Sequence, residues 1–248
     1  MILVKYATRS FIGTRQTQDD SADCLLTENG LFAVVCDGIG SRKNGAASSK
    51  MTVESLIESF RSSYSGNFPE FITKAVEKTD DIVFDRYGSS CGTTVVSACI
   101  ENDSLYWLSV GDSRLYIIRN GKIKQLTTDH NYGYVLELRK QKNLIDDETY
   151  NKEQIKAGQL ASFIGMGGID IVDVSMKPIR LNNGDRLLLS TDGLYKPLAE
   201  KKICDIIYSS ADPSAAADHL LSDVKQTHQP LDNTTFTLIF FDKTEEEQ

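Results

Sequence analysis

Residues 31–40 read Leu-Phe-Ala-Val-Val-Cys-Asp-Gly-Ile-Gly, an apolar run that ends in an Asp-Gly pair. Residues 186–194, Arg-Leu-Leu-Leu-Ser-Thr-Asp-Gly-Leu, repeat this arrangement later in the chain. Asp-Gly usually forms a tight hairpin turn, but here a short loop and a helical pattern follow each pair. We therefore predict that Asp37 and Asp192 project from strand ends, where the following glycine lets the backbone approach a ligand.

Short β-type runs dominate the first and last thirds of the sequence, too closely spaced for helical crossovers. They cover residues 31–36, 93–100, 105–110, 115–119, 122–126, 186–190 and 235–241. Three turn pairs between such runs predict hairpins, and hence antiparallel sheets. These pairs are Asn102-Asp103, Asn120-Gly121 and Asn183-Gly184.

Helical periodicity appears in four stretches, residues 46–60, 69–87, 132–142 and 213–226. Each stretch has one apolar stripe that needs a sheet face to cover, so we expect helices outside a β core. The polar segment 143–159 has little apolar material and predicts a mobile surface excursion. The fold class is therefore α+β.

The composition is that of an ordinary soluble globular protein, with 40% hydrophobic and 25% charged residues among 248. No Pro/Gly/Ser-rich linker divides the sequence, so we expect a single domain over residues 1–242 and a frayed acidic tail over 243–248. The net charge of −8 argues against nucleic acid or an anionic membrane as a partner. We expect a monomer.

Five cysteines occur without a CxxC pair, which fits a reducing compartment and argues against a disulfide framework or a thiolate zinc site. The longest apolar run, Leu31–Cys36, is far shorter than the roughly 20 residues that span a bilayer. Lys5 and Arg9 interrupt the N-terminal sequence and leave no room for a signal-peptide core. We expect a cytoplasmic protein.

Further carboxylates stand at strand boundaries. Asp112 lies between two β runs, where a hairpin turn is the favoured interpretation. Asp232 precedes the last β run, and Asp19-Asp20 follow Arg15 in a polar stretch. If these boundaries share one rim of the sheets, the carboxylates converge and repel one another unless cations neutralise them. All-oxygen ligation selects Mg²⁺ or Mn²⁺ over zinc, and the three histidines are isolated in the sequence.

The ordered set of motifs resembles the metal-dependent type-2C protein Ser/Thr phosphatases, in their bacterial single-domain form. Any one of these motifs is weak evidence for the family, but their order along the sequence is specific, and together they span nearly the whole chain. The strings are Arg15 with Asp19-Asp20, Val-Val-Cys-Asp37-Gly38-Ile-Gly40, Cys-Gly92-Thr93-Thr94, Ser-Val-Gly111-Asp112-Ser113-Arg114, Leu-Thr-Thr-Asp129-His130, Leu-Leu-Leu-Ser-Thr-Asp192-Gly193-Leu194 and Asp232-Asn233.

The resemblance implies a four-layer α/β/β/α sandwich, in which helices flank two antiparallel sheets. It also implies a centre of two Mn²⁺ or Mg²⁺ ions at one end of the sandwich. The implied ligands are Asp37 bridging both ions, Asp192 and Asp232 on one ion, and the Gly38 carbonyl with Asp19 or Asp20 on the other, partly through water.

The resemblance assigns three further features. Arg15 corresponds to the residue that grips the substrate phosphate, and Asp112 with Asp192 matches a weaker position for a third ion. The segment 143–159 falls where the family has a flap beside the catalytic cleft. Ile39 stands where some members have a histidine credited with general-acid help, so it cannot protonate the leaving group.

The mechanistic hypothesis is hydrolysis of phosphoserine and phosphothreonine by one in-line displacement, with direct attack of a metal-bridging hydroxide. Arg15 offers paired N–H donors that match phosphate oxygens. By family analogy, the substrates are phosphorylated proteins that a Ser/Thr kinase produces. Two alternatives stay open: a catalytically silent, metal-dependent sensor of the same fold, and a small-molecule phosphatase.

Overall fold

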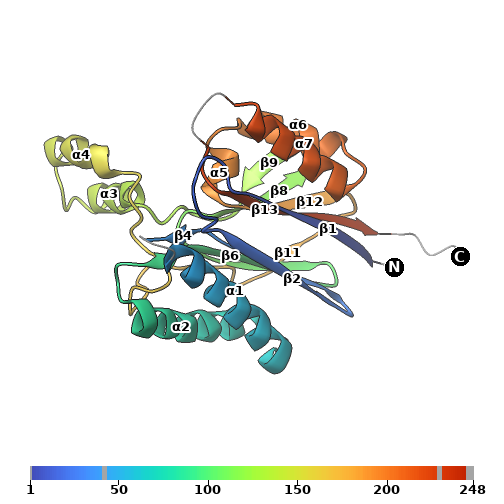
Figure 1. Ribbon diagram of the computed structural model, residues 1–248, viewed down its shortest axis with the longest axis horizontal. Coiled ribbons are helices and arrows are strands. Elements are labelled where there is room, and N and C mark those ends of the chain that lie inside the picture. The colour runs from blue at the N-terminus through green and yellow to red at the C-terminus, as the bar shows by residue number, and fades with distance from the viewer. Residues whose placement is uncertain (1, 41–43, 228–230, 244–248) are drawn as a thin grey trace, which may run out of the picture.

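The computed structural model describes residues 2–40, 44–227 and 231–243. Two antiparallel sheets pack face to face, and helices cover both outer faces (Figure 1). The predicted α+β fold, a four-layer α/β/β/α sandwich, is confirmed. Of the predicted acidic tail, 243–248, only Lys243 lies within the described residues, where it ends the last strand.

The first sheet has the strand order β1-β13-β12-β8-β9, and the second has the order β10-β7-β6-β3-β2 with β11 beside β7. The strands of the first are β1 (Ile2–Phe11), β8 (Arg114–Arg119), β9 (Lys122–Gln125), β12 (Asp185–Ser190) and β13 (Thr234–Lys243). Those of the second are β2 (Ser21–Thr27), β3 (Gly30–Cys36), β6 (Val95–Glu101), β7 (Ser104–Val110), β10 (Asp173–Val174) and β11 (Ile179–Arg180). Two short strands, β4 (Gly38–Ile39) and β5 (Gly92–Thr93), pair separately.

Helices α1 (Asn44–Ser63) and α2 (Phe68–Tyr87) cover the second sheet, whereas α6 (Glu200–Ser209) and α7 (Pro213–Lys225) cover the first (Figure 1). A short helix, α5 (Asp192–Tyr195), follows β12 directly. Helices α3 (Tyr132–Gln141) and α4 (Asp147–Glu153), with a 3₁₀ turn over Gln154–Lys156, project from the sandwich. The four predicted helices are thereby confirmed.

Strand β3 shows how the sequence builds the layers, because its alternate side chains enter different cores. Phe32, Val34 and Cys36 face α1 and α2. Leu31, Ala33 and Val35 face the other sheet. A strand that is buried on both faces reads as a continuous apolar run, which is why residues 31–36 stand out in the sequence.

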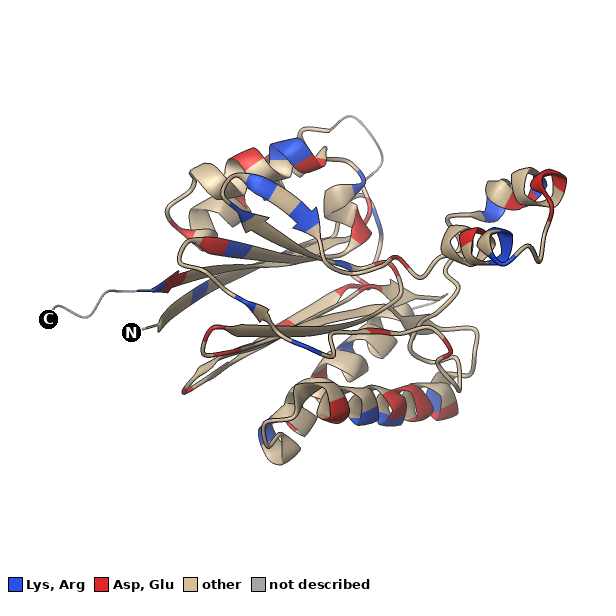
Figure 2. Cartoon of the chain, turned by 180° about the vertical axis from the view of Figure 1, so that it is seen from behind, with Lys and Arg blue, Asp and Glu red and all other residues tan. Residues whose placement is uncertain are grey.

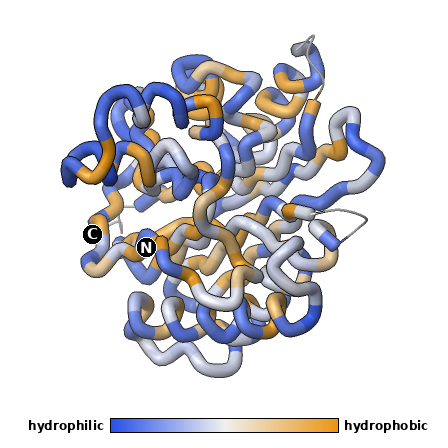
Figure 3. The backbone as a smooth tube through the Cα atoms, turned by 90° about the vertical axis from the view of Figure 1, so that its left-hand side faces the viewer, coloured by the Kyte–Doolittle hydropathy of each residue, from blue (hydrophilic) through white to orange (hydrophobic). Residues whose placement is uncertain are grey.

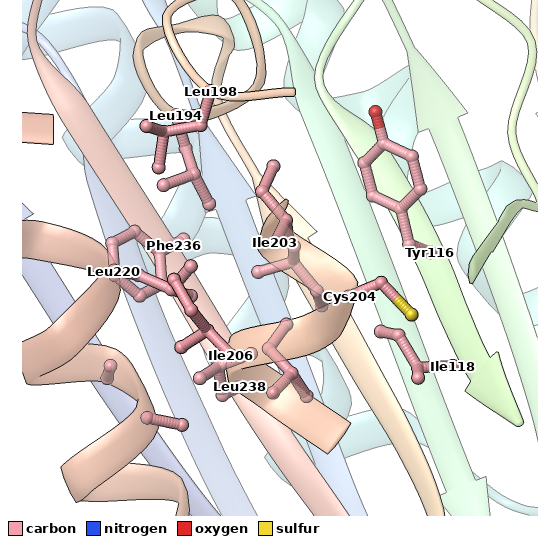
Figure 4. Close-up of a cluster of buried hydrophobic side chains, with 14 of the residues drawn as sticks. Tyr116, Ile118, Leu194, Leu198, Ile203, Cys204, Ile206, Leu220, Phe236 and Leu238 are labelled. Atoms are coloured by element: carbon pink, nitrogen blue, oxygen red, sulfur yellow. The ribbon is translucent and has the colours of Figure 1, made fainter. Parts of the chain in front are cut away.

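The opposite outer layer is built in the same way. Figure 4 shows Phe236 and Leu238 of β13 meeting Ile203 and Ile206 of α6 and Leu220 of α7. Each fully buried side chain of this size contributes about 1.5–3 kcal/mol by leaving water. These contacts hold α6 and α7 on the sheet, and they keep β12 and β13 in a fixed register at the end where Asp192 and Asp232 lie.

The distribution of charged and apolar residues follows the layers of the sandwich. In Figure 2 the charged residues gather on helices and connections, with both signs interspersed along α2, while the strands are mostly uncharged. In Figure 3 hydrophobic colouring lies mainly inside the molecule, and hydrophilic colouring dominates the outer turns of the chain. The surface therefore resembles that of an ordinary globular protein.

Two predicted hairpins are confirmed and two are wrong. Asn102 and Asn120 adopt positive φ angles of 53° and 52° in the β6–β7 and β8–β9 hairpins, a conformation that asparagine tolerates. Asn183-Gly184 instead leads from β11 in one sheet to β12 in the other. Gly111-Asp112 likewise connects β7 to β8 across the two sheets. The same turn residues serve both purposes, so local sequence does not distinguish them.

Strands β1 and β2 and helix α4 were not predicted, and neither were the short elements β4, β10, β11 and α5. Strand β1 is an edge strand with mixed exposure, and β2 is only partly buried, so neither has a strong apolar pattern. Helix α4 falls within the segment 143–159 that we expected to be irregular, and none of its residues is buried. Its start is fixed by Asp146, whose side chain accepts a hydrogen bond from the Thr149 N–H.

The core between the second sheet and helices α1 and α2 should lose stability when the Phe32 ring is removed. Phe32 is fully buried, stacks on Phe60 with ring centroids 4.3 Å apart and meets Phe68 edge-on. We expect Phe32→Ala to lower the free energy of unfolding by about 3–5 kcal/mol in chemical denaturation, because it leaves a cavity. The exposed Leu26 is the control, and Leu26→Ala should stay within about 0.5 kcal/mol of wild type. Equal losses in the two variants would contradict this packing.

Candidate active site

Asp37 follows β3, and its backbone is fixed on both sides. Its N–H donates to Thr94 Oγ1 at 3.0 Å, and its carbonyl accepts from the Thr94 N–H at 2.9 Å and from Thr93 Oγ1 at 2.8 Å. The next residue must be glycine, since a Cβ at Gly38 would lie 2.3 Å from the Gly45 carbonyl oxygen. The structure therefore places the Asp37 side chain at a set point on the sheet end.

Asp192 and Asp232 are brought together by a second close backbone contact. Asp192 begins α5 directly after β12, and Asp232 precedes β13, the neighbouring strand. A Cβ at Gly193 would lie 2.0 Å from the Asn233 carbonyl oxygen, so only glycine permits this approach. Thr234 Oγ1 then donates to the Gly193 carbonyl at 3.0 Å and ties the two turns.

Asn233 secures the loop that carries Arg15, Asp19 and Asp20. Its Oδ1 accepts from the Asp19 N–H at 2.7 Å, and its Nδ2 donates to the carbonyls of Ile12 and Thr17 at 2.8 and 2.9 Å. The loop is thereby held against the start of β13. Asp20 is buried, and its Oδ2 accepts from Thr191 Oγ1 at 3.0 Å.

These residues surround one cleft of about 870 Å³. The predicted site residues that line it are Arg15, Asp19, Asp37, Gly38, Asp112, Asp192 and Asp232. Asp20 lies behind them in the core and does not line the cleft. Gly158, Gln159, Leu160 and Phe163 also line the cleft and are called the wall below, so the end of the segment 143–159 borders the cleft.

The carboxylates of the cleft repel one another. Burial raises the pKa of Asp37 well above its ordinary value, and the charges of Asp20, Asp192, Asp112 and Asp232 raise it further. Burial and neighbouring aspartates also raise the pKa of Asp20 to about 7, and that of Asp112 to about 6. Such shifts are typical of functional sites, where a fold holds charged groups in an unfavourable arrangement.

Two cations approach this cluster from the rim. Arg15 Nη2 donates to Asp232 Oδ2 at 2.6 Å, with both side chains partly exposed. Lys196 pairs with Asp192 one helical turn away. Asp192 is largely buried while Lys196 is mostly exposed, so the ammonium neutralises the carboxylate from the solvent side.

Asp112 is held through its backbone by an aromatic support. Tyr195 donates its hydroxyl to the Asp112 carbonyl at 2.9 Å. The Arg114 guanidinium lies 3.7 Å from the centre of the Tyr195 ring and forms a bidentate pair with Asp129. The cation–π contact and the ion pair together fix the Gly111-Asp112 turn, where the chain passes from the second sheet to the first.

The donor set fits a hard divalent cation in its chemistry. Its donors are carboxylate and carbonyl oxygens, which Mg²⁺ and Mn²⁺ prefer. Asp19 Oδ1 and Asp20 Oδ1 are buried and have no hydrogen-bond partner among the described residues, and an ion or an ordered water would satisfy such oxygens. Within the described ranges, however, no three His, Cys, Asp or Glu side chains are spaced to share one metal ion. In this arrangement Asp232 is paired with Arg15 and Asp192 with Lys196, so these two carboxylates contact cations of the chain itself.

Sequence reasoning missed the residues that support the carboxylates. Lys196 could have been found from its spacing, because it lies four residues after Asp192, immediately after the end of α5. Asn233 and Thr94 belong to the family-like strings, but their roles depend on contacts between segments distant in the sequence. Tyr195 likewise gives no signal of its own.

The protein phosphatase 2C family matches residues 9–235. The chain belongs to this family. The predicted family and enzyme class, a phosphoric monoester hydrolase of the protein phosphatase type, are confirmed.

Individual relatives of this phosphatase 2C chain agree with that assignment. It is 28% identical over 227 residues to the serine/threonine phosphatase stp of Listeria monocytogenes, covering 88% of this chain and 87% of that protein. The S. agalactiae serine/threonine phosphatase structure superimposes with a TM-score of 0.82 at 21% identity, over 96% and 99% of the two chains. The catalytic domain of PstP, in complex with two manganese ions, gives a TM-score of 0.78 at 20% identity, over 98% and 100%.

Two further observations concern the whole phosphatase chain. No helix in the described ranges is long and apolar enough to cross a membrane. Cys24, Cys36, Cys91, Cys99 and Cys204 are all free. Cys36 adjoins Asp37 but is fully buried in the core, as the strand pattern indicated.

The crowding of carboxylates gives a stability prediction for the metal-free protein. Because the folded-state pKa of Asp37 is raised, the native state binds protons more tightly than the unfolded chain, and this contribution to stability is lost as the pH rises above 3.8. We therefore expect Asp37→Asn to raise the melting temperature in chelator at about pH 8, and to raise it less at about pH 5.

Asp103→Asn is the control, because the pKa of Asp103 is shifted in the direction opposite to that of Asp37. Lys243 and Arg180 lower the pKa of Asp103, so neutralising this residue removes favourable pairing and should give no gain at either pH. Loss of stability in Asp37→Asn at about pH 8 would show that Asp37 is not under repulsion.

Proposed function

We propose that this phosphatase 2C chain is a metal-dependent protein serine/threonine phosphatase that works with Mn²⁺ or Mg²⁺. The observation that carries the proposal is one cleft in which partly buried, mutually repelling carboxylates stand beside an arginine. Carboxylates in this arrangement call for cations, and a guanidinium beside them matches a phosphate group. Hydrolysis of a phosphate ester is the reaction that uses both.

The proposed ligand assignments are those that the family resemblance implies. Asp37, on which the charges of Asp20, Asp192, Asp112 and Asp232 all act, would serve two ions, with Asp192 and Asp232 on one of them. The Gly38 carbonyl with Asp19 or Asp20 would serve the other ion, and the orphaned oxygens of both aspartates support that assignment. Asp112 with Asp192 would form a weaker third position. When bound, the ions supply Lewis acidity and lower the pKa of a coordinated water.

The remaining tasks fall to the chain itself. Arg15 stands at the rim with a side chain that is 60% exposed, so it can exchange Asp232 for a phosphate oxygen. Its two N–H donors would orient the phosphate and neutralise charge on the equatorial oxygens. Ile39 lines the cleft without an ionisable group, so this position supplies no proton to the leaving oxygen.

Substrate and partner follow from the relatives. The Listeria monocytogenes relative is a serine/threonine phosphatase, and the PstP structure contains manganese. For this chain we propose phosphorylated proteins as substrates, made by a Ser/Thr kinase. The cytoplasm is the proposed location, because all five cysteines are free in the structure.

The proposal is tested by hydrolysis of a phosphothreonine peptide and of an aryl phosphate, with Mn²⁺ and with chelator. We expect Mn²⁺-dependent turnover of both substrates, and a loss of at least about 100-fold in Asp37→Asn, since a shared ligand is removed. Mn²⁺ binding without turnover would instead identify a silent sensor. Turnover of the aryl ester alone would identify a small-molecule phosphatase.

The role of Arg15 is tested by Arg15→Lys, which keeps the charge but loses the paired donors. We expect the KM for the phosphopeptide to rise roughly tenfold, because a charge-assisted hydrogen bond to the phosphate is lost. Arg9→Lys is the matched control, since Arg9 pairs with Asp218 and Ser214 outside the cleft. An unchanged KM in Arg15→Lys would remove Arg15 from phosphate binding.

A further inference from the structure

A buried carboxylate outside the cleft holds a loop that leads into it. Asp80 lies on α2 with 2% of its surface exposed. Its Oδ1 accepts hydrogen bonds from the N–H groups of Gly165 at 2.5 Å and Met166 at 3.0 Å, and its Oδ2 accepts from the Gly168 N–H at 2.7 Å. The assigned site leaves this residue without a role.

The loop is shaped to present its N–H groups to one anion. Gly165, Gly167 and Gly168 have φ angles of 106°, 75° and 142°, which side-chain-bearing residues rarely adopt. Successive backbone N–H groups turned toward one point form a concave anion site. A carboxylate is acceptor-only and satisfies several donors at once, whereas an amide would place its own donors against them.

The same loop is tied to the backbone that supports Asp37. Ile164 and Thr93 exchange two hydrogen bonds, of 3.0 and 2.8 Å, and Thr93 Oγ1 donates to the Asp37 carbonyl. A Cβ at Gly92 would lie 2.2 Å from the Ile164 carbonyl oxygen and 2.5 Å from the Phe163 ring, so the loop packs directly on β5. Phe163, at the start of the loop, lines the cleft.

The other end of this wall is held independently. The Tyr132 N–H donates to the Gln159 carbonyl at 2.7 Å, and the Ala161 N–H donates to the His130 carbonyl at 2.9 Å. These bonds secure residues 159–161 without Asp80. Release of Asp80 would therefore loosen Gly165 to Gly168, including Met166, whose sulfur accepts a hydrogen bond from the Phe163 N–H at 3.4 Å, while the two Ile164–Thr93 bonds and the beginning of the wall stay in place.

We propose that Asp80 is a positioning residue that fixes Phe163 as a preset wall for the residues flanking the phosphorylated side chain. The proposal rests on the proposed function. Phe163 and Leu160 are apolar groups of the cleft lining, and they come from a different part of the chain than Arg15 and the carboxylates. The charged residues of the cleft would bind the phosphate, whereas the peptide on either side of it would contact the apolar side chains of the wall. An aryl phosphate is too small to need the wall.

The test compares Asp80→Asn with Asp81→Asn, an exposed neighbour on α2 whose substitution makes the same change of charge. Asp80→Asn should raise the KM for a phosphothreonine peptide by roughly tenfold or more, because hydrogen bonds to a charged group are lost. Its kcat/KM for an aryl phosphate and its Mn²⁺ affinity should stay within about twofold of wild type. Asp81→Asn should resemble wild type on both substrates. Amide hydrogen exchange at Gly165, Met166 and Gly168 should become faster in Asp80→Asn alone.

A second variant keeps the proposal open to refutation if Asp80→Asn does not fold. Phe163→Ala removes the wall directly and should cause the same peptide-selective rise in KM. In the double variant the two effects should not add, because both act on one contact.

Several results would overturn the proposal. Equal losses on peptide and aryl phosphate, with weakened Mn²⁺ binding, would mean that Asp80 acts through Thr93 on Asp37. An unchanged KM for the phosphothreonine peptide in Asp80→Asn, or in Phe163→Ala, would show that Asp80 only stabilises the loop and has no effect on peptide binding. Failure of the proposed function looks different, because wild type itself would then turn over no phosphopeptide.

Discussion

Electrostatic repulsion between carboxylates is the constraint around which this molecule is arranged. Asp37, Asp112, Asp192 and Asp232 line one cleft with Asp20 buried behind them, and the charges of the other four raise the pKa of Asp37 beyond the effect of burial. Side chains of like charge do not gather spontaneously, and here rigid backbone turns force them together. The fold therefore gives up stability at this edge, and divalent cations would restore it on binding.

Close backbone contacts make the convergence possible. Gly38 and Gly193 each bring a carbonyl oxygen to a distance that no Cβ tolerates, and both follow a proposed ligand directly. The two apolar layers keep β3, β12 and β13 in register behind these turns. The proposed ligands thus stand at strand ends, whereas Arg15 and Phe163 stand on loops that hydrogen bonds hold in place.

Much of the fold could be predicted because its strongest signals are local. The apolar run before Asp37 and the four amphipathic helices have periodicities that single segments reveal. Strand β1 escaped prediction because an edge strand with Lys5 and Arg9 has no continuous apolar face. The sheet-crossing turns at Gly111-Asp112 and Asn183-Gly184 looked like hairpins because turn residues do not specify which sheet comes next. The site's carboxylates were recognised from ordered motifs, but Asn233 and Asp80 act across 214 and up to 88 positions of sequence, where local patterns carry no information.

The central claim is that these carboxylates gather around divalent cations, and anomalous diffraction from crystals grown with Mn²⁺ tests it most directly. The account expects two strong manganese peaks in the cleft that share Asp37, one of them beside Asp192 and Asp232 and the other beside the Gly38 carbonyl. Manganese bound only elsewhere on the surface, with the Arg15–Asp232 and Lys196–Asp192 pairs intact at saturating Mn²⁺, would contradict it.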